Sequence, residues 1–188
     1  MPVLIRDASL SDIDAITAIY RDSVLKGVAS YEIAPPDRDE MAARYQVIVD
    51  KGYPYIAAVD ETGALIGYAY ASAFRTRPAS RFMVEDSIYL APEARGKGVG
   101  KRLLEELIAR STALGFRQMI AVIAVIGGAH PASIALHASH GFEEIGRIKG
   151  SGFKHGRWLD TMLMQRVLGD GTSTDPDPST HPATLFAG

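Results

Sequence analysis

The chain has no cysteine among its 188 residues. This absence excludes disulfides, metal sites built on thiolates and catalysis by a cysteine nucleophile. The sequence also has no apolar run near the roughly 20 residues that a membrane-spanning helix needs. Its first residues lack the basic and then apolar layout of a signal peptide. We therefore expect a soluble, cytoplasmic protein with no membrane partner.

An excess of one charge is also missing, because 20 basic and 22 acidic residues give a formal net charge of −2. Residues 169–188 contain Asp170, Asp175 and Asp177 but no lysine or arginine, so the rest of the chain is close to neutral. A broad nucleic-acid-binding surface needs a dominant basic excess. We therefore expect no nucleic-acid partner.

Residues 169–188 are rich in glycine, serine, threonine, aspartate and proline. Such a composition buries too little apolar surface to offset the entropy of ordering the chain. The sequence therefore predicts one domain over residues 1–168 and a disordered C-terminal tail over residues 169–188.

Within residues 1–168, apolar residues recur in alternating helical and strand patterns. The expected strands are residues 3–7, 55–59, 65–74, 82–90, 119–126, 143–149 and 158–168. The expected helices are residues 11–26, with Ser11 as the cap, a segment between Asp37 and Gly52, residues 99–114 and residues 132–140. The segment 119–126 is apolar without alternation, which is typical of a central strand buried on both faces. The pattern predicts an α/β fold in which helices flank a mixed, mostly antiparallel sheet.

A glycine-rich turn, Arg95-Gly96-Lys97-Gly98-Val99-Gly100-Lys101, joins an expected strand to an expected helix. Its glycines let backbone amides approach an anion, and the positive end of the helix favours a pyrophosphate there. The turn lacks the third glycine of the dinucleotide-binding fingerprint, and neither lysine is followed by the serine or threonine of a Walker loop. These mismatches disfavour a nucleotide-binding protein of either kind.

The arginine and glycines at Arg95, Gly98 and Gly100 resemble the acetyl-CoA motif of the GNAT acetyltransferase superfamily, and Leu136-His137 followed by Gly141-Phe142 resembles a later helix and turn of that superfamily. More narrowly, residues 84–90 (VEDSIYL) and 152–160 (GFKHGRWLD) resemble phosphinothricin and methionine sulfoximine N-acetyltransferases. The resemblance covers roughly residues 3–167. It implies the GNAT fold, with a splayed or bulged strand at the acetyl-CoA site.

The resemblance also implies which residues hold acetyl-CoA. The backbone of Ile88, Tyr89 and Leu90 is expected to pair with the pantetheine arm, and a β-bulge there would free the peptide groups. His130 stands where relatives commonly have an asparagine that contacts pantetheine, and Ser139 is a further candidate for a cofactor hydrogen bond. The residues expected around the diphosphate are Arg95, Gly96, Lys97, Gly98, Val99, Gly100 and Lys101.

Acetyl transfer to an amine needs a base, because most of the amine is protonated at neutral pH. The resemblance implies that Glu85 is this base, and burial would raise its pKa toward the working pH. A free amide in the segment 88–90 would polarise the thioester carbonyl. His137 stands where many relatives place a tyrosine that protonates the departing thiolate. His140 has no carboxylate or third ligand near it in the sequence, so we expect no metal.

For the acceptor, the resemblance points to Arg75 as a bidentate partner for a substrate carboxylate, with Phe74 beside it. Tyr31 stands where relatives close the pocket with an aromatic side chain. The favoured function is an acetyl-CoA-dependent N-acetyltransferase that detoxifies a small amino acid analogue, in a homodimer by family analogy. A peptide or protein N-terminal acetyltransferase and a non-catalytic CoA-binding module remain as alternatives.

Overall fold

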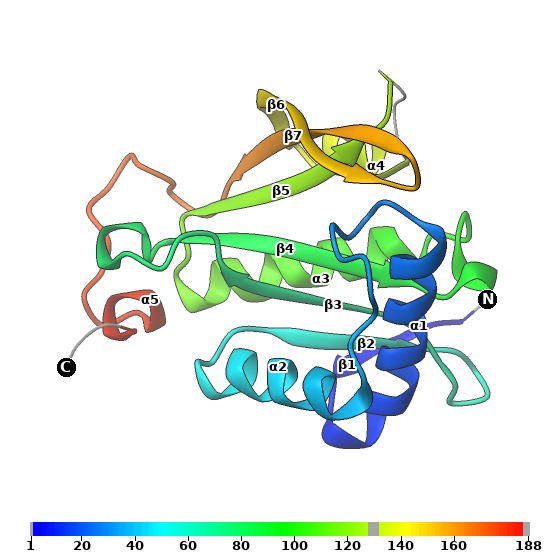
Figure 1. The fold of residues 1–188 in the computed structure, drawn as a ribbon. Coiled ribbons are helices and arrows are strands. Elements are labelled where there is room, and N and C mark those ends of the chain that lie inside the picture. The colour runs from blue at the N-terminus through cyan, green and yellow to red at the C-terminus, as the bar shows by residue number, and fades with distance from the viewer. Residues whose placement is uncertain (1, 128–131, 186–188) are drawn as a thin grey trace.

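The protein is described by a computed structural model that covers residues 2–127 and 132–185 (Figure 1). Its centre is a seven-stranded sheet in the order β1-β2-β3-β4-β5-β7-β6. The strands are β1 (Leu4–Asp7), β2 (Tyr55–Val59), β3 (Leu65–Ala73), β4 (Met83–Leu90), β5 (Gln118–Val125), β6 (Glu143–Lys154) and β7 (Arg157–Val167). Only the β4–β5 pair is parallel, so the expected mixed and mostly antiparallel sheet is confirmed.

The helices lie on both faces of this sheet (Figure 1). They are α1 (Ile13–Lys26), α2 (Arg38–Asp50), α3 (Val99–Leu114), α4 (Ala132–Ala138) and α5 (His181–Thr184), with short 3-10 turns at Leu10–Asp12, Pro78–Ser80 and Pro92–Ala94. On one face, Tyr20 of α1 packs edge-on against Tyr89 of β4 at 5.0 Å between ring centroids. On the other face, fully buried Leu103, Leu104 and Leu107 bring α3 into the core. None of the helices among the described residues is long and apolar enough to cross a membrane.

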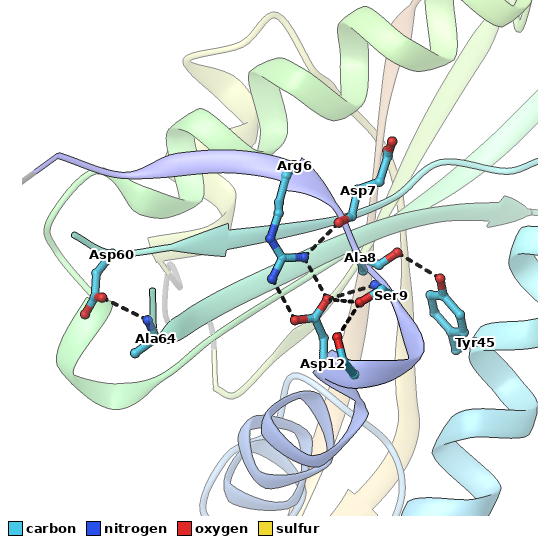
Figure 2. Close-up of polar contacts among 9 residues, drawn as sticks. Arg6, Asp7, Ala8, Ser9, Asp12, Tyr45, Asp60 and Ala64 are labelled. Carbon is cyan, nitrogen blue, oxygen red and sulfur yellow. Dashed lines mark hydrogen bonds and ion pairs between the residues drawn. The ribbon is translucent and has the colours of Figure 1, made fainter. Parts of the chain in front are cut away.

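The start of the first helix differs from the expectation that Ser11 caps it. A 3-10 turn comes first, and the buried carboxylate of Asp12 organises it (Figure 2). Asp12 accepts hydrogen bonds from the backbone amide of Ser9 at 2.8 Å and from two nitrogens of Arg6 at 2.7 Å each. The Arg6 hydrogen bonds lower the pKa of Asp12, so the carboxylate stays ionised and fixes α1 to β1.

The sheet divides between β4 and β5. These strands pair only at Met83–Gln118, Val84–Met119 and Glu85–Ile120. Beyond these pairs β4 stays with β3, without a register shift from Ala73–Val84 to Gly67–Leu90, while β5 stays with β7 along its whole length. The expected splay is therefore present, and it comes from divergence of β4 and β5, because the β3–β4 register contains no bulge.

The β6–β7 hairpin is longer than the sequence pattern predicts. Strand β6 continues to Lys154, and the chain turns at His155 and Gly156, which have φ angles of 51° and 70°. The pattern missed the second half of β6 because glycines at 150 and 152 interrupt its apolar alternation. This extension brings the hairpin tip to the loop that follows α1, as the hydrogen bonds below show.

The C-terminal segment, for which the composition predicts a disordered tail, makes contacts with the domain in the structure. The ring of His181 in α5 packs edge-on against Tyr53 and Phe116, at 6.2 and 6.0 Å between centroids, and Pro182 is buried. Earlier in the segment, Arg117 donates a hydrogen bond to the Gly171 carbonyl at 3.2 Å. A few apolar and aromatic groups near residue 181 therefore anchor a segment whose overall composition is typical of disorder.

Candidate active site

A cleft of about 840 Å³ opens where β4 and β5 separate. Its walls come from β4, β5, the start of α3, α4 and the loop after α1. The cleft residues from β4 are Glu85, Asp86, Ser87, Ile88, Tyr89 and Leu90. Those from the loop after α1 are Gly27, Val28, Ala29, Ser30 and Tyr31. The expected cofactor strand and the expected base therefore share one cleft.

One end of the cleft is shaped for an anion. Gly96 and Gly98 have φ angles of 71° and 79°, a left-handed backbone that favours glycine. They lead into α3, whose first amides have no carbonyl partner within the helix. Arg95 and Lys101 add positive charge along the same wall. This arrangement suits a diphosphate group.

Two of the residues expected in this turn do not line the cleft. Val99 is buried beneath the turn, and the side chain of Lys97 is exposed. Gly100 does line the cleft, and a Cβ there would lie 3.4 Å from Leu90 and 3.5 Å from Leu136. A Cβ at this position would therefore make ordinary van der Waals contacts with both cleft walls.

Glu85 lies at the last β4–β5 pair, where the cleft begins. Burial, followed by the charge of Asp86, raises the pKa of Glu85 to about 7. A carboxylate with this pKa can take a proton from an ammonium group near neutral pH and release it again. The position and the pKa of Glu85 agree with the base expected from the sequence.

His137 has both ring nitrogens engaged. Nε2 lies 3.0 Å from Oδ2 of Asp86, and Nδ1 lies 2.7 Å from the carbonyl oxygen of Ser133. Burial alone would lower the pKa of His137, but the hydrogen bond and charge of Asp86 raise it above its ordinary value. With both nitrogens facing acceptors, the ring has no nitrogen left for a departing thiolate, which differs from the expected acid.

The acceptor end of the cleft is closed by the loop after α1. The Tyr31 hydroxyl lies 3.0 Å from Ser151 Oγ on β6, and Lys154 donates a hydrogen bond to the Ser30 carbonyl at 2.7 Å. His155 Nε2 lies 3.2 Å from the Gly27 carbonyl oxygen. Tyr31 therefore lies where an aromatic side chain was expected, and the hairpin tip holds its loop in place.

Arg75 and Phe74 do not line this cleft. The Arg75 guanidinium is exposed and lies 5.1 Å from the centroid of the Phe74 ring. Both residues follow the end of β3, and Arg75 comes three residues after Ser72, which pairs with Glu85. The pair thus lies just beyond the base on the neighbouring strand, outside the cleft walls.

Comparison with known proteins agrees with this geometry. The acetyltransferase (GNAT) family pattern matches residues 14–142. The chain belongs to the GNAT family. It is 50% identical over 166 residues, 88% of this chain and 83% of the relative, to a phosphinothricin N-acetyltransferase of Alcaligenes faecalis. It is 39% identical over 176 residues, 94% of this chain and 100% of the relative, to an L-methionine sulfoximine/L-methionine sulfone acetyltransferase of Pseudomonas paraeruginosa.

Among solved structures, a GNAT superfamily phosphinothricin acetyltransferase from Sinorhizobium meliloti, in complex with AcCoA, is 63% identical. The match covers 99% of both chains, with a TM-score of 0.94. The expected GNAT fold is therefore confirmed, and the protein is an acetyltransferase.

Two further cofactor expectations concern the α4 region of this GNAT chain. His130 lies outside the described residues. The Ser139 hydroxyl donates a hydrogen bond to the Leu136 carbonyl at 2.7 Å, so it completes the end of α4 and does not line the cleft. Ser133 and Leu136 line the cleft from α4 in its place.

Sequence reasoning missed Asp86, which lines the cleft and pairs with His137. It lies next to Glu85 in an otherwise largely apolar strand, and that placement was the available signal. Lys154 belongs to the segment 152–160 that resembles the family, but the sequence does not show its contact. The lysine is buried, and its partner Ser30 lies 124 residues away in the chain.

Proposed function

We propose that this GNAT enzyme transfers the acetyl group of acetyl-CoA to the primary amine of a small amino acid analogue of the phosphinothricin or methionine sulfoximine type. The observation that carries the proposal is Glu85 at the point where β4 and β5 separate, with a pKa of about 7. The names of the relatives and the AcCoA complex of the 63% identical structure support the two substrates.

In the proposed mechanism, the amides around Gly96, Gly98 and Lys101 bind the diphosphate, and the free edge of β4 from Ile88 to Leu90 binds the pantetheine arm. Glu85 takes a proton from the acceptor ammonium, and the neutral nitrogen then attacks the thioester carbonyl carbon. A β4 amide stabilises the oxygen that becomes negative. The nitrogen of the tetrahedral intermediate loses its second proton to solvent in the cleft and the carbon–sulfur bond breaks, which leaves a neutral amide. The departing thiolate takes a proton from the same solvent, since His137 has no free nitrogen for this step.

A turnover screen tests this function. Purified protein with acetyl-CoA is offered phosphinothricin, methionine sulfoximine, methionine sulfone, ordinary amino acids and short peptides, and CoA release is measured. We expect turnover of the amino acid analogues well above that of peptides. Turnover of peptides alone would instead identify an N-terminal acetyltransferase, and CoA binding without turnover would identify a binding module.

We also propose that Arg75 binds the acceptor carboxylate. Ser72 of β3 pairs with Glu85, and Arg75, whose guanidinium is exposed, comes three residues after Ser72. Arg75→Ala should raise the KM of amino acid acceptors about tenfold or more, as loss of a charge-assisted pair predicts. The KM of amines without a carboxylate should not change. Arg77→Ala, an exposed neighbour in the same loop, is the control. Equal effects of Arg75→Ala on both kinds of acceptor would contradict the assignment.

We propose that the reaction detoxifies its substrate, because acetylation converts a cationic amine into a neutral amide. We also propose that the enzyme is cytoplasmic and homodimeric. Exposed apolar side chains on the β6–β7 hairpin support the dimer: Ile145, Ile148, Phe153 and Trp158. Sedimentation velocity of the full chain should give twice the mass of one chain, whereas a monomer at micromolar concentration would contradict the dimer.

A further inference from the structure

Asp86 is the first residue of β4 beyond the last β4–β5 pair, Glu85–Ile120. Side chains alternate along a strand, so Asp86 points to the opposite face from Glu85. There its Oδ2 lies 3.0 Å from Nε2 of His137 in α4, and the two side chains are 3% and 4% exposed. A buried side-chain contact therefore joins β4 to α4 where backbone pairing stops.

The His137 ring is fixed on three sides. Ser133 accepts from Nδ1, Asp86 lies against Nε2, and Phe142 packs edge-on at 4.9 Å between centroids. When Nδ1 donates to the Ser133 carbonyl and Asp86 is ionised, Nε2 carries the second proton and the contact is an ion pair; the raised pKa of His137 favours this form. Replacing a buried ion pair by apolar side chains often costs no stability. Stability alone therefore does not explain why this pair is present.

The ion pair joins two walls of the cleft. Helix α4 contributes Ala132, Ser133 and Leu136 to one wall, and β4 beyond Asp86 contributes the strand expected to bind pantetheine. Beyond Glu85, β4 has no backbone pairs with β5, and the Asp86–His137 contact there links β4 to α4 through side chains. The other oxygen of Asp86, Oδ1, is buried without a partner among the described residues.

Asp86 also acts on Glu85 through charge. It is the second cause, after burial, of the raised pKa of Glu85. The other titratable groups nearby are Tyr70, which faces Glu85 from β3, and His137, which faces Asp86 from α4. Glu32 and Arg44 act on Tyr70 from the acceptor side. Asp86 is the charged group that directly changes the protonation of Glu85.

We propose that Asp86 is a positioning residue for acetyl transfer. Its ion pair with His137 holds the α4 wall of the cleft against β4, and its carboxylate is the charged neighbour of Glu85 along β4. The effect of Asp86 on Glu85 rests on the proposed function, in which Glu85 is the base. The contact between the cleft walls requires only that the protein binds CoA. Asp86 acts through His137 and Glu85 and does not itself touch the reacting atoms.

Two substitutions separate the two effects. In Asp86→Asn, the amide can donate to a neutral His137, which keeps the contact but removes the charge. We expect the acidic limb of kcat/KM to move to lower pH, because Asp86 raises the pKa of Glu85 and His137 does not contribute to that shift, with the KM for acetyl-CoA within twofold of wild type. In Asp86→Ala the contact is lost, and we expect the KM for acetyl-CoA and the dissociation constant of CoA to rise roughly tenfold or more.

Asp39→Asn, at an exposed aspartate in the first turn of α2, is the matched control and should change neither quantity. An unchanged acidic limb in Asp86→Asn would overturn the charge effect, and wild-type CoA affinity in folded Asp86→Ala would overturn the wall contact. If Asp86→Ala does not fold, His137→Leu, whose side chain has no polar atom, provides the same test of the contact by calorimetric CoA titration. CoA titration does not depend on the acceptor, so failure of the acceptor screen alone would count against the proposed function and not against this contact.

Discussion

The hydroxyl of Tyr31, in the loop after α1, lies 2.5 Å from Oγ1 of Thr161 on β7. The Tyr31 ring lies next to Gly152 of β6, where a Cβ would lie only 2.5 Å from Cδ1 of the ring. The acceptor end of the cleft therefore depends on a glycine in the middle of a strand, where glycine otherwise weakens the sheet.

This contact predicts that Gly152→Ala displaces Tyr31 and opens the acceptor end. We expect the KM for the amino acid acceptor to rise about tenfold, with little change in the KM for acetyl-CoA, because a small misplacement of a wall residue lowers acceptor binding. Steady-state kinetics with each substrate varied in turn measures both. Gly146→Ala is the control, since a Cβ at Gly146 of the same strand meets no atom within 4 Å. Equal acceptor KM values in the two variants would contradict the prediction.

Glu85 predicts the pH dependence of the enzyme. Its pKa is raised to about 7, so the basic carboxylate form increases as the pH rises from 6 to 8, and kcat/KM should rise over the same range. Glu85→Gln cannot accept the proton, so we expect a loss of about 10²–10⁴-fold in kcat and no break near pH 7. CoA affinity, measured by calorimetry, should stay within twofold.

The matched control for this charge change is Glu61→Gln, an exposed residue in the turn between β2 and β3. Its pH profile should overlay that of the wild type. A Glu85→Gln enzyme that keeps the break near pH 7 would show that another group is the base.

The parts of the fold that follow from local chemistry could be predicted from the sequence. Helix α3 begins and ends where predicted, because Gly98 and Gly115 flank it with φ angles of 79° and 98°. The glycine turn before α3 likewise indicated an anion site from its residues alone. In both cases the information lies within a few consecutive residues.

The parts that could not be predicted depend on contacts between distant residues. Asp86 and His137 are 51 residues apart, and only the folded sheet shows that both ring nitrogens of His137 are engaged. The C-terminal segment reads as disordered because its composition does not reveal that Tyr53 and Phe116 pack against His181. The sequence also does not show that the Arg75 side chain lies over Phe74 beside the cleft, the place from which we propose that it binds the acceptor carboxylate.

The glycine turn predicts a separable effect on acetyl-CoA binding. Gly98→Ala places a Cβ on a backbone with φ 79°, which costs about 1–2 kcal/mol for an L-residue. Relaxation of this strain would move the amides at the start of α3, so we expect the dissociation constant of acetyl-CoA to rise about tenfold. Calorimetric titration measures it.

Gly63→Ala is the matched control for strain. Gly63 has φ 84° in the β2–β3 turn, and a Cβ there meets no atom within 4 Å, as is also true at Gly98. Both variants should lose similar thermal stability, but only Gly98→Ala should lose affinity. Similar affinities in the two variants would mean that the turn does not hold the cofactor.

The C-terminal segment predicts a change in stability without a change in activity. Deleting residues 170–188 removes the packing of His181 on Tyr53 and Phe116 and the burial of Pro182. Loss of about 1–2 kcal/mol of apolar burial should lower the melting temperature by roughly 2–8 °C in a chain of this size. The segment packs at the end of α3 that leads to Phe116, whereas the cleft includes the start of α3.

Kinetics and thermal melting of the same samples separate these two effects. The 16 residues of α3 span about 24 Å, and this length separates the C-terminal segment from the cleft. We therefore expect kcat and both KM values of the truncated enzyme to stay within twofold of wild type below its melting temperature. His181→Ala in the full-length chain should reproduce part of the loss in melting temperature, because it removes the aromatic contacts and leaves the rest of the segment. An unchanged melting temperature in both variants would mean that the segment does not pack on the domain in solution, as its composition alone predicts.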